Sequence, residues 1–256
     1  MMKQVDFNQL LGFQFDSQQF LDNNCRHVFG ARSATNQGNF AFSGNRDIVA
    51  ATAVRRTWCD FIQADSQQLV VGGQSHTAHI AIVDSQHASR GALAPTTVIP
   101  DCDGLITLTP GLPLYVAVAD CSAVLLSAPG IVGVVHGGWR GLQANILPVA
   151  VAHFAEFGAS AETISAGVAP CIQAASYEVG PEVAIDCPAV AKYRGEGDRW
   201  HVDIGMWAKQ QLMDSGLAEC HIEMSGMDSR SDPRVFSHRR EGTPSGRNGL
   251  LAVLGD

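Results

Sequence analysis

Hydrophobic residues in this chain gather into short runs that are separated by turns rich in Gly, Pro, Asn, Asp and Ser. The runs are rich in Val, Ile and Leu and are bounded by turn residues, which is the pattern of buried β-strands. We therefore expect strands within residues 26–31, 69–76, 79–84, 103–109, 113–120, 121–128, 131–136, 163–170, 201–204, 220–225 and 250–254.

Apolar residues recur with helical spacing in other stretches of the chain. One such stretch follows Asp47, which is placed to cap a helix, and another begins at Pro181, a favourable residue for a first helical turn. The predicted helices cover residues 48–62, residues 141–157 despite Pro148, a short stretch from residue 181, and residues 205–216, where Gly216 ends the last helix.

Strands and helices follow one another without the regular repeat of βαβ units. We therefore predict an α/β fold of the mixed α+β kind, with a large mixed β-sheet flanked by helices. No linker, repeat or low-complexity stretch divides the sequence, so residues 1–256 are expected to form a single domain. Two long loops, residues 32–46 and 225–248, both carry arginines, and long loops in a compact domain are usually functional.

The composition narrows the class of protein. The chain has 256 residues, 46% hydrophobic and 16% charged, so it can bury a sizeable core and is not disordered. A net charge of −8 argues against a nucleic-acid-binding surface. The N-terminus does not resemble a signal peptide and no apolar run approaches roughly 20 residues, so we expect no membrane association. Seven scattered cysteines without a Cys-x-x-Cys pair favour a reduced, cytoplasmic protein.

Three predicted strands end in residues that can bind a metal or act as nucleophiles. LYVAVAD leads to Cys121, IVGVV leads to His136 and a Gly-rich turn, and LVVGGQSH ends at His76. Their spacing is not that of a zinc finger but fits strands that converge on one point. Two imidazoles and a thiolate suit zinc and leave a fourth position open for water or substrate, and copper can use the same ligands. On this pattern alone His79 can replace His76.

The same residues allow a second interpretation without a metal. Cys121 could be a nucleophile with His136 as its base, in a hydrolase that acts on an amide or a cell-wall precursor peptide. A non-catalytic metal-binding or nucleotide-binding module is a further alternative. Bound metal distinguishes the cysteine hydrolase from the metal-dependent interpretations.

Several motifs in order resemble the laccase-domain family, once called multicopper polyphenol oxidases. The family's Ala-Asp-Cys matches residues 119–121, and its His-x-Gly-Trp-Arg-Gly matches residues 136–141. Its Gln-Val-His-Gly appears here as QSHT, which favours His76 over His79 as a ligand. APCI, YEVG, FSHRRE and SGR match further family motifs, so the resemblance extends from about residue 28 to the end of the chain.

Bacterial members of this family are regarded as zinc-dependent purine nucleoside phosphorylases with adenosine deaminase activity. The resemblance therefore implies one catalytic zinc held by His76, Cys121 and His136. It also implies phosphorolysis of adenosine, inosine, guanosine and methylthioadenosine, with a nucleoside and phosphate as the binding partners. A copper phenol oxidase is the weaker alternative, because nine histidines without a His-x-His pair do not suit a four-copper site.

Phosphorolysis requires phosphate to be held near C1′ of the ribose, and the planar guanidinium of arginine can bind two of its oxygens. Arg32 matches the family's loop arginine and is the first candidate. Further candidates for binding substrate or phosphate are Arg140, Arg239, Arg240 and Arg247. Asp120 is a candidate to orient a ligand histidine through a hydrogen bond.

The chain departs from the family pattern beside these candidates. Val-His-Gly has become Ser-His-Thr around His76, while His238 and Glu241 replace the family's Tyr and Asp. The loop in residues 32–46 is shorter than usual and lacks the family's Asn. These changes predict altered substrate contacts around an unaltered set of metal ligands.

Overall fold

The computed structural model describes residues 2–33, 38–42 and 47–255. Its strands form two six-stranded mixed sheets and one small three-stranded sheet. Sheet I has the order β1-β2-β3-β15-β7-β4, sheet II has the order β14-β10-β8-β9-β6-β5, and the small sheet has the order β11-β13-β12. Neighbouring strands are antiparallel except in the pairs β4–β7, β5–β6 and β10–β14, which lie at the sheet edges.

The strands of sheet I are β1 (Lys3–Phe7), β2 (Leu10–Gln14), β3 (Cys25–Gly30), β15 (Asn248–Leu254), β7 (Leu114–Val118) and β4 (Val70–Val71). Those of sheet II are β14 (Ile222–Met224), β10 (Ser165–Val168), β8 (Ser122–Ala128), β9 (Ile131–Gly137), β6 (Gly104–Thr107) and β5 (Ile80–Ile82). The small sheet consists of β11 (Glu178–Val179), β13 (Trp200–Val202) and β12 (Lys192–Arg194). The helices are α1 (Gln18–Asp22), α2 (Ile48–Phe61), α3 (Trp139–Gln143), α4 (Ile146–Glu156), α5 (Pro181–Ala184), α6 (Ile204–Asp214) and α7 (His238–Glu241).

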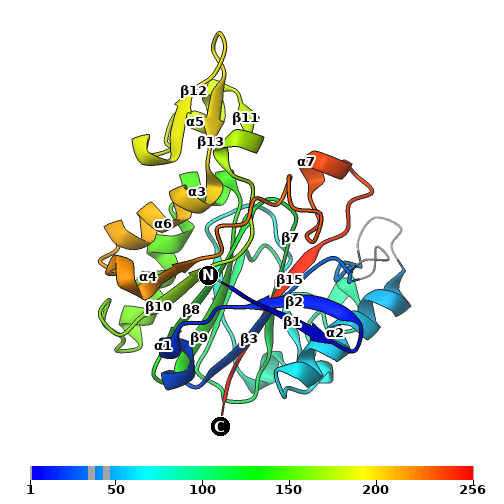
Figure 1. Ribbon diagram of the computed structural model, residues 1–256. Coiled ribbons are helices and arrows are strands. Elements are labelled where there is room, and N and C mark those ends of the chain that lie inside the picture. The colour runs from blue at the N-terminus through cyan, green and yellow to red at the C-terminus, as the bar shows by residue number, and fades with distance from the viewer. Residues whose placement is uncertain (1, 34–37, 43–46, 256) are drawn as a thin grey trace.

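Sheets I and II lie face to face and enclose the inner part of the core. The strand β15 shows this arrangement, because its side chains point alternately toward sheet II and toward the helix α2. Leu250 and Ala252 join the cluster between the two sheets, whereas Leu251 and Val253 join the cluster under α2. Helices therefore cover both outer faces, with α2 on sheet I and α3, α4 and α6 on sheet II, and the small sheet projects from one end (Figure 1).

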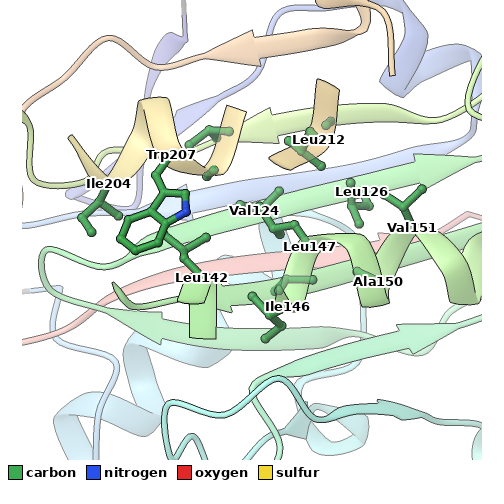
Figure 2. Close-up of a cluster of buried hydrophobic side chains, with 14 of the residues drawn as sticks. Val124, Leu126, Leu142, Ile146, Leu147, Ala150, Val151, Ile204, Trp207 and Leu212 are labelled. Atoms are coloured by element: carbon green, nitrogen blue, oxygen red, sulfur yellow. The ribbon is translucent and has the colours of Figure 1, made fainter. Parts of the chain in front are cut away.

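The helical layer over sheet II is built from large aliphatic and aromatic side chains. Figure 2 shows Trp207 and Leu212 of α6 and Leu147 of α4 next to Val124 and Leu126 of β8. All five are buried. Burying a side chain of this size contributes roughly 1.5–3 kcal/mol to the free energy of unfolding, so this layer fixes the sheet that carries much of the site.

The helix predicted over residues 141–157 is divided into α3 and α4. Asn145 has a left-handed backbone with φ of 60° and separates the two helices. Pro148 lies in the first turn of α4, where no intrahelical partner for its missing N–H is needed. The prediction for α2 is confirmed, since the side chain of Asp47 accepts hydrogen bonds from the backbone N–H groups of Val49 and Ala50.

The predicted mixed α+β class is confirmed, but the strands are divided between two packed sheets where the sequence pattern suggested one large sheet. Hydrophobic runs show that a strand is buried on both faces, and they do not show which strand lies beside it. The N-terminal hairpin of β1 and β2, the helix α1 and the edge strands of the small sheet were not predicted. Within the described ranges no helix is long and apolar enough to cross a membrane.

Candidate metal site

Three predicted ligands meet where the chain passes from sheet I to sheet II. His76 lies between β4 and β5, Cys121 lies between β7 and β8, and His136 lies in β9. One potential ligand atom from each side chain lies within 4.8 Å of the other two. Ligand atoms around a tetrahedral zinc are roughly 3–4 Å apart, because the bonds are about 2.0–2.3 Å long. The donor set and its spacing therefore fit a single metal ion after small side-chain movements.

The pairing of β8 with β9 places Cys121 beside the glycines that follow His136. Ser122 is paired with Gly137, so Cys121 faces Gly138. A Cβ atom on Gly138 would lie 2.7 Å from Cδ2 of His76 and 3.2 Å from Sγ of Cys121. Only glycine at this position leaves room for both side chains.

The buried carboxylate of Asp103 organises the site. Its Oδ1 accepts hydrogen bonds from Nδ1 of His136 at 2.8 Å and from the backbone N–H of His76 at 3.0 Å. Its Oδ2 accepts from the backbone N–H and the hydroxyl of Thr77 at 2.7 and 2.9 Å, and from the backbone N–H of Ser75 at 3.2 Å. Because Nδ1 of His136 is engaged, Nε2 is the nitrogen left for a metal.

The side chain of Gln74 forms strand-like hydrogen bonds with β7 in the segment before His76. After β4 ends, Gln74 donates to the carbonyl of Ala117 at 2.8 Å and accepts from its N–H at 2.8 Å. These two bonds hold the segment before His76 against β7, the strand that leads to Cys121. His76 itself has a left-handed backbone with φ of 64°, which turns its ring toward His136. The two rings are 4.8 Å apart between centroids and nearly perpendicular.

The electrostatics of the site favour a thiolate. Burial raises the pKa of Cys121, but the charge of His136 and hydrogen bonds from His136 and His76 outweigh it and lower the pKa to about 6. Burial lowers the pKa of His136, and the Cys121 thiolate and Asp103 outweigh this and raise it to about 9. Burial likewise opposes ionisation of Asp103, yet its hydrogen bonds from His136 and Thr77 hold its pKa well below the usual range. A metal that binds here displaces the proton of His136.

The three residues open into a cavity of about 660 Å³. Its floor follows one face of β7, since Tyr115, Ala117 and Ala119 alternate along the strand toward Cys121. Trp139, Tyr177, His238 and Arg239 also line it. A cavity of this size is adequate for a small organic ligand such as a nucleoside.

The predicted arginines are distributed unevenly around this cavity. Arg247 lines it. Arg140 is exposed and its guanidinium lies 4.1 Å from the Trp139 ring centroid, outside the cavity lining. Arg32 forms an ion pair with Glu241 at 2.7 Å and is also absent from the lining.

Arg240 organises the C-terminal loop. Its Nη1 donates to the backbone carbonyls of Ser229, Arg230 and Asp232 at 2.9, 3.0 and 3.0 Å. It does not line the cavity. Its contacts indicate that it holds the loop in shape beside the site.

The sequence suggested that Asp120 orients a ligand histidine, but its hydrogen bonds in the described ranges are made to other residues. Its carboxylate accepts hydrogen bonds from the hydroxyl of Ser229 and the backbone N–H of Arg239, both at 2.6 Å. Asp120 therefore attaches the C-terminal loop and α7 to the strand end that carries Cys121. Asp103 is the residue that orients a histidine, and its only signal in the sequence is an acidic residue at the start of the strand predicted over residues 103–109.

Comparison with known proteins identifies the family of this chain. The model of the family described as multi-copper polyphenol oxidoreductase laccase matches residues 26–255, and the chain belongs to this family. A purine nucleoside phosphorylase from Bacteroides thetaiotaomicron is 28% identical over 93% of this chain and 94% of its own. Adenosine deaminase RL5, from an unknown prokaryotic organism, is 28% identical over 78% of this chain and 80% of its own.

The fold has a close counterpart among solved structures. YlmD from Geobacillus stearothermophilus superimposes with a TM-score of 0.90 over 96% of each chain, at 22% sequence identity. The face-to-face arrangement of the two sheets is therefore shared with a solved structure.

Proposed function

We propose that this protein is a zinc-dependent purine nucleoside phosphorylase that also deaminates adenosine. The observation that carries the proposal is the meeting of His76, Cys121 and His136 at one end of a nucleoside-sized cavity. Relatives named purine nucleoside phosphorylase and adenosine deaminase support the substrate class. The proposed substrates are adenosine, inosine, guanosine and methylthioadenosine, with phosphate as the second substrate.

In this proposal His76, Cys121 and His136 hold the zinc, and Asp103 keeps the His136 ring in place. When bound, the zinc supplies Lewis acidity at the end of the cavity. The aromatic rings of Trp139 and Tyr177 line the cavity and are placed to contact a purine.

Phosphorolysis breaks the C1′–N9 bond of the nucleoside and forms a bond between C1′ and a phosphate oxygen. The purine leaves with the bonding electron pair and takes up a proton. Deamination replaces the 6-amino group of adenosine with oxygen from water and releases ammonia. Among the predicted phosphate-binding residues, Arg239 and Arg247 have the support of lining the cavity, while Arg32, Arg140 and Arg240 remain proposals without that support.

The remaining features of the proposal concern the chain as a whole. All seven cysteines are free thiols, which supports a reducing, cytoplasmic location. We take residues 1–256 as one domain, because β3 near the N-terminus and β15 at the C-terminus are neighbours in sheet I.

Metal content is the first test. Protein purified without added metal should contain about one zinc per chain by mass spectrometry, and Cys121→Ala should lose it. Cys220→Ala is the matched control, because Cys220 is exposed and outside the cavity. Copper in place of zinc would favour the phenol oxidase.

Activity is the second test. The zinc-loaded protein should release adenine from adenosine only when phosphate is present, and should form inosine without phosphate. Absence of both products at full zinc occupancy would rule the proposal out.

One observation favours a second candidate, a cysteine hydrolase. The side chain of His136 is hydrogen-bonded to Asp103 on one side and to Cys121 on the other, which is the arrangement of a carboxylate, a base and a nucleophile. The pKa of Cys121 is also lowered, as a nucleophile requires. A metal-free protein that is fully active on an amide, and that iodoacetamide inactivates, would establish this candidate instead.

A further inference from the structure

A buried arginine that sequence reasoning did not single out lines the cavity at a distance from the metal ligands. Arg55 belongs to α2, and the residue is only 4% exposed. Burying a guanidinium is costly unless its charge is compensated, and the usual compensation is a carboxylate. Among the residues that the structure describes, none forms an ion pair with Arg55.

Backbone carbonyls hold the guanidinium in place. Nε of Arg55 donates to the carbonyl of Phe40 at 2.9 Å, and Nη1 donates to those of Gly91 and Ala92 at 2.8 and 3.2 Å. The ring of Phe42 lies 3.7 Å from the guanidinium carbon. None of these three bonds uses Nη2, and the remaining polar neighbour of the guanidinium among the described residues is the Tyr115 hydroxyl, with which it interacts electrostatically.

A second polar group beside Arg55 is also without a partner. The guanidinium of Arg55 lies 4.9 Å from the ring centroid of Tyr115. Tyr115 is 1% exposed, and its hydroxyl has no hydrogen-bond partner of good geometry in the described ranges. Leaving a buried hydroxyl in this state is unfavourable, so a ligand that forms a hydrogen bond with it gains affinity.

The charge of the cavity favours an anion at this end. Arg55, Arg239 and Arg247 line the cavity, and Asp120 is the single acidic residue in the described part of its lining. The carboxylate of Asp120 is occupied by Ser229 and by the backbone of Arg239. The cavity is therefore cationic inside a protein whose net charge is −8.

The part of the cavity that favours an anion and the metal site belong to one continuous cavity. Tyr115 lies six residues before Cys121 on the same chain segment, so their backbones are roughly 20 Å apart at most. Ala117 of β7 and Ala119, just beyond the end of the strand, lie between them in the cavity lining, and their small side chains leave the cavity open. A ligand that reaches both ends is elongated and carries negative charge at the end away from the metal.

We infer that Arg55 and Tyr115 form a subsite for a phosphoryl group, which accepts hydrogen bonds from Nη2 of Arg55 and from the Tyr115 hydroxyl. The inference rests on the proposed function, in which phosphate is a substrate. The same chemistry would recognise free orthophosphate or the 5′-phosphate of a nucleotide. Nothing in the cavity itself distinguishes these two sources, so the experiment does.

Binding is measured on the zinc-loaded, full-length protein by isothermal titration calorimetry with inorganic phosphate and, separately, with 5′-AMP. The first variant is Tyr115→Phe, which keeps the buried ring and removes a hydroxyl without a hydrogen bond of good geometry in the described ranges, so the variant should fold. The second is Arg55→Gln. Arg56→Gln is the matched control, since Arg56 is the next residue on α2, is exposed and does not line the cavity.

Tyr115→Phe should raise the Kd of the recognised ligand roughly tenfold or more, as expected for a hydrogen bond to a charged group, and Arg55→Gln should raise it further. Arg56→Gln should not change it. Weakened binding of inorganic phosphate identifies orthophosphate as the ligand, and weakened binding of 5′-AMP alone identifies a nucleotide. The inference is overturned if wild-type protein binds neither probe or if Tyr115→Phe binds both as wild type does.

These outcomes are separate from those that decide the proposed function. A protein that binds phosphate through Tyr115 and Arg55 but releases no adenine would contradict phosphorolysis and leave the subsite standing. Phosphorolysis with an unchanged KM for phosphate in Tyr115→Phe, together with unchanged binding of 5′-AMP, would support the enzyme and remove the subsite. If Arg55→Gln fails to fold, Tyr115→Phe alone decides the inference.

Discussion

One oxygen of the Asp103 carboxylate holds the ring of His136, with Oδ1 lying 2.8 Å from Nδ1. The same oxygen accepts the backbone N–H of His76, so a single buried carboxylate sets the positions of two candidate metal ligands. The ligands come from different loops and strands, and Asp103 is the group that connects them.

Replacing Asp103 by Asn should weaken zinc binding by roughly 10- to 100-fold, because the amide cannot accept all the hydrogen bonds that position the two histidines. The measurement is competition for zinc against a chromogenic chelator. Asp101→Asn is the matched control, since Asp101 is exposed and contributes only a backbone carbonyl, to His79. Equal zinc affinity in both variants would contradict this role for Asp103.

Gly138→Ala should abolish high-affinity metal binding while leaving the fold intact. The new Cβ would lie 2.7 Å from the His76 ring, and this exposed ring is free to move aside and leave the site. Metal content and circular dichroism together check the prediction. Gly195→Ala is the control, because its nearest neighbours are 3.3 Å away and outside the cavity. Full zinc occupancy in Gly138→Ala would show that the site tolerates the added methyl group.

Asp120→Ala should raise the KM for the nucleoside and leave zinc content unchanged. The substitution releases Ser229 and the first turn of α7 from the end of β7. His238 and Arg239, which line the cavity, are carried by that helix. Hydrogen exchange should show faster exchange in residues 225–248 of the variant. Wild-type exchange rates there would mean that Arg240 alone holds the loop.

Stability should fall in acid through His27, a buried histidine outside the site. Burial lowers its pKa to about 4, and Nε2 accepts the backbone N–H of Phe15. Its ordinary pKa is near 6.5, so between about pH 6.5 and 4 the unfolded chain takes up a proton that the folded chain does not. Stability is therefore fully present above about pH 6.5 and is lost as the pH falls toward 4, by up to about 3 kcal/mol.

Urea unfolding at pH 7 and at pH 4.5 tests this contribution. His27→Gln keeps an acceptor for Phe15 and cannot titrate, so its stability should fall less between the two pH values than that of the wild type. His153→Gln is the control, because His153 is at the surface of α4. The prediction fails if wild type and His27→Gln lose the same stability.

Much of this architecture could be predicted from the order of hydrophobic runs, since every predicted strand overlaps an observed one. The ligand candidates could also be found, because Cys121 and His136 each follow a strongly apolar strand. The division into two sheets could not, because pairing between β3 and β15 depends on contacts across most of the chain.

Asp103 and Arg55 could not be recognised from the sequence either, because their roles also depend on long-range contacts. In the sequence Asp103 is only the first residue of a predicted strand. Its importance comes from hydrogen bonds to segments that lie 26 to 33 positions away. Arg55 reads as one of two adjacent arginines on an amphipathic helix, and only its burial distinguishes it from Arg56. Chemistry at strand ends is visible in a sequence, whereas groups that act through long-range contacts are not.

The placement of the ligands at the passages between sheet I and sheet II has a mechanical consequence. His76 and Cys121 end segments anchored in sheet I, while His136 belongs to sheet II. A metal held by all three is a cross-link between the halves of the sandwich, and the halves cannot separate until it dissociates. The lifetime of the folded protein against proteolysis would then be governed by metal release, so its durability in a cell would depend on the supply of that metal.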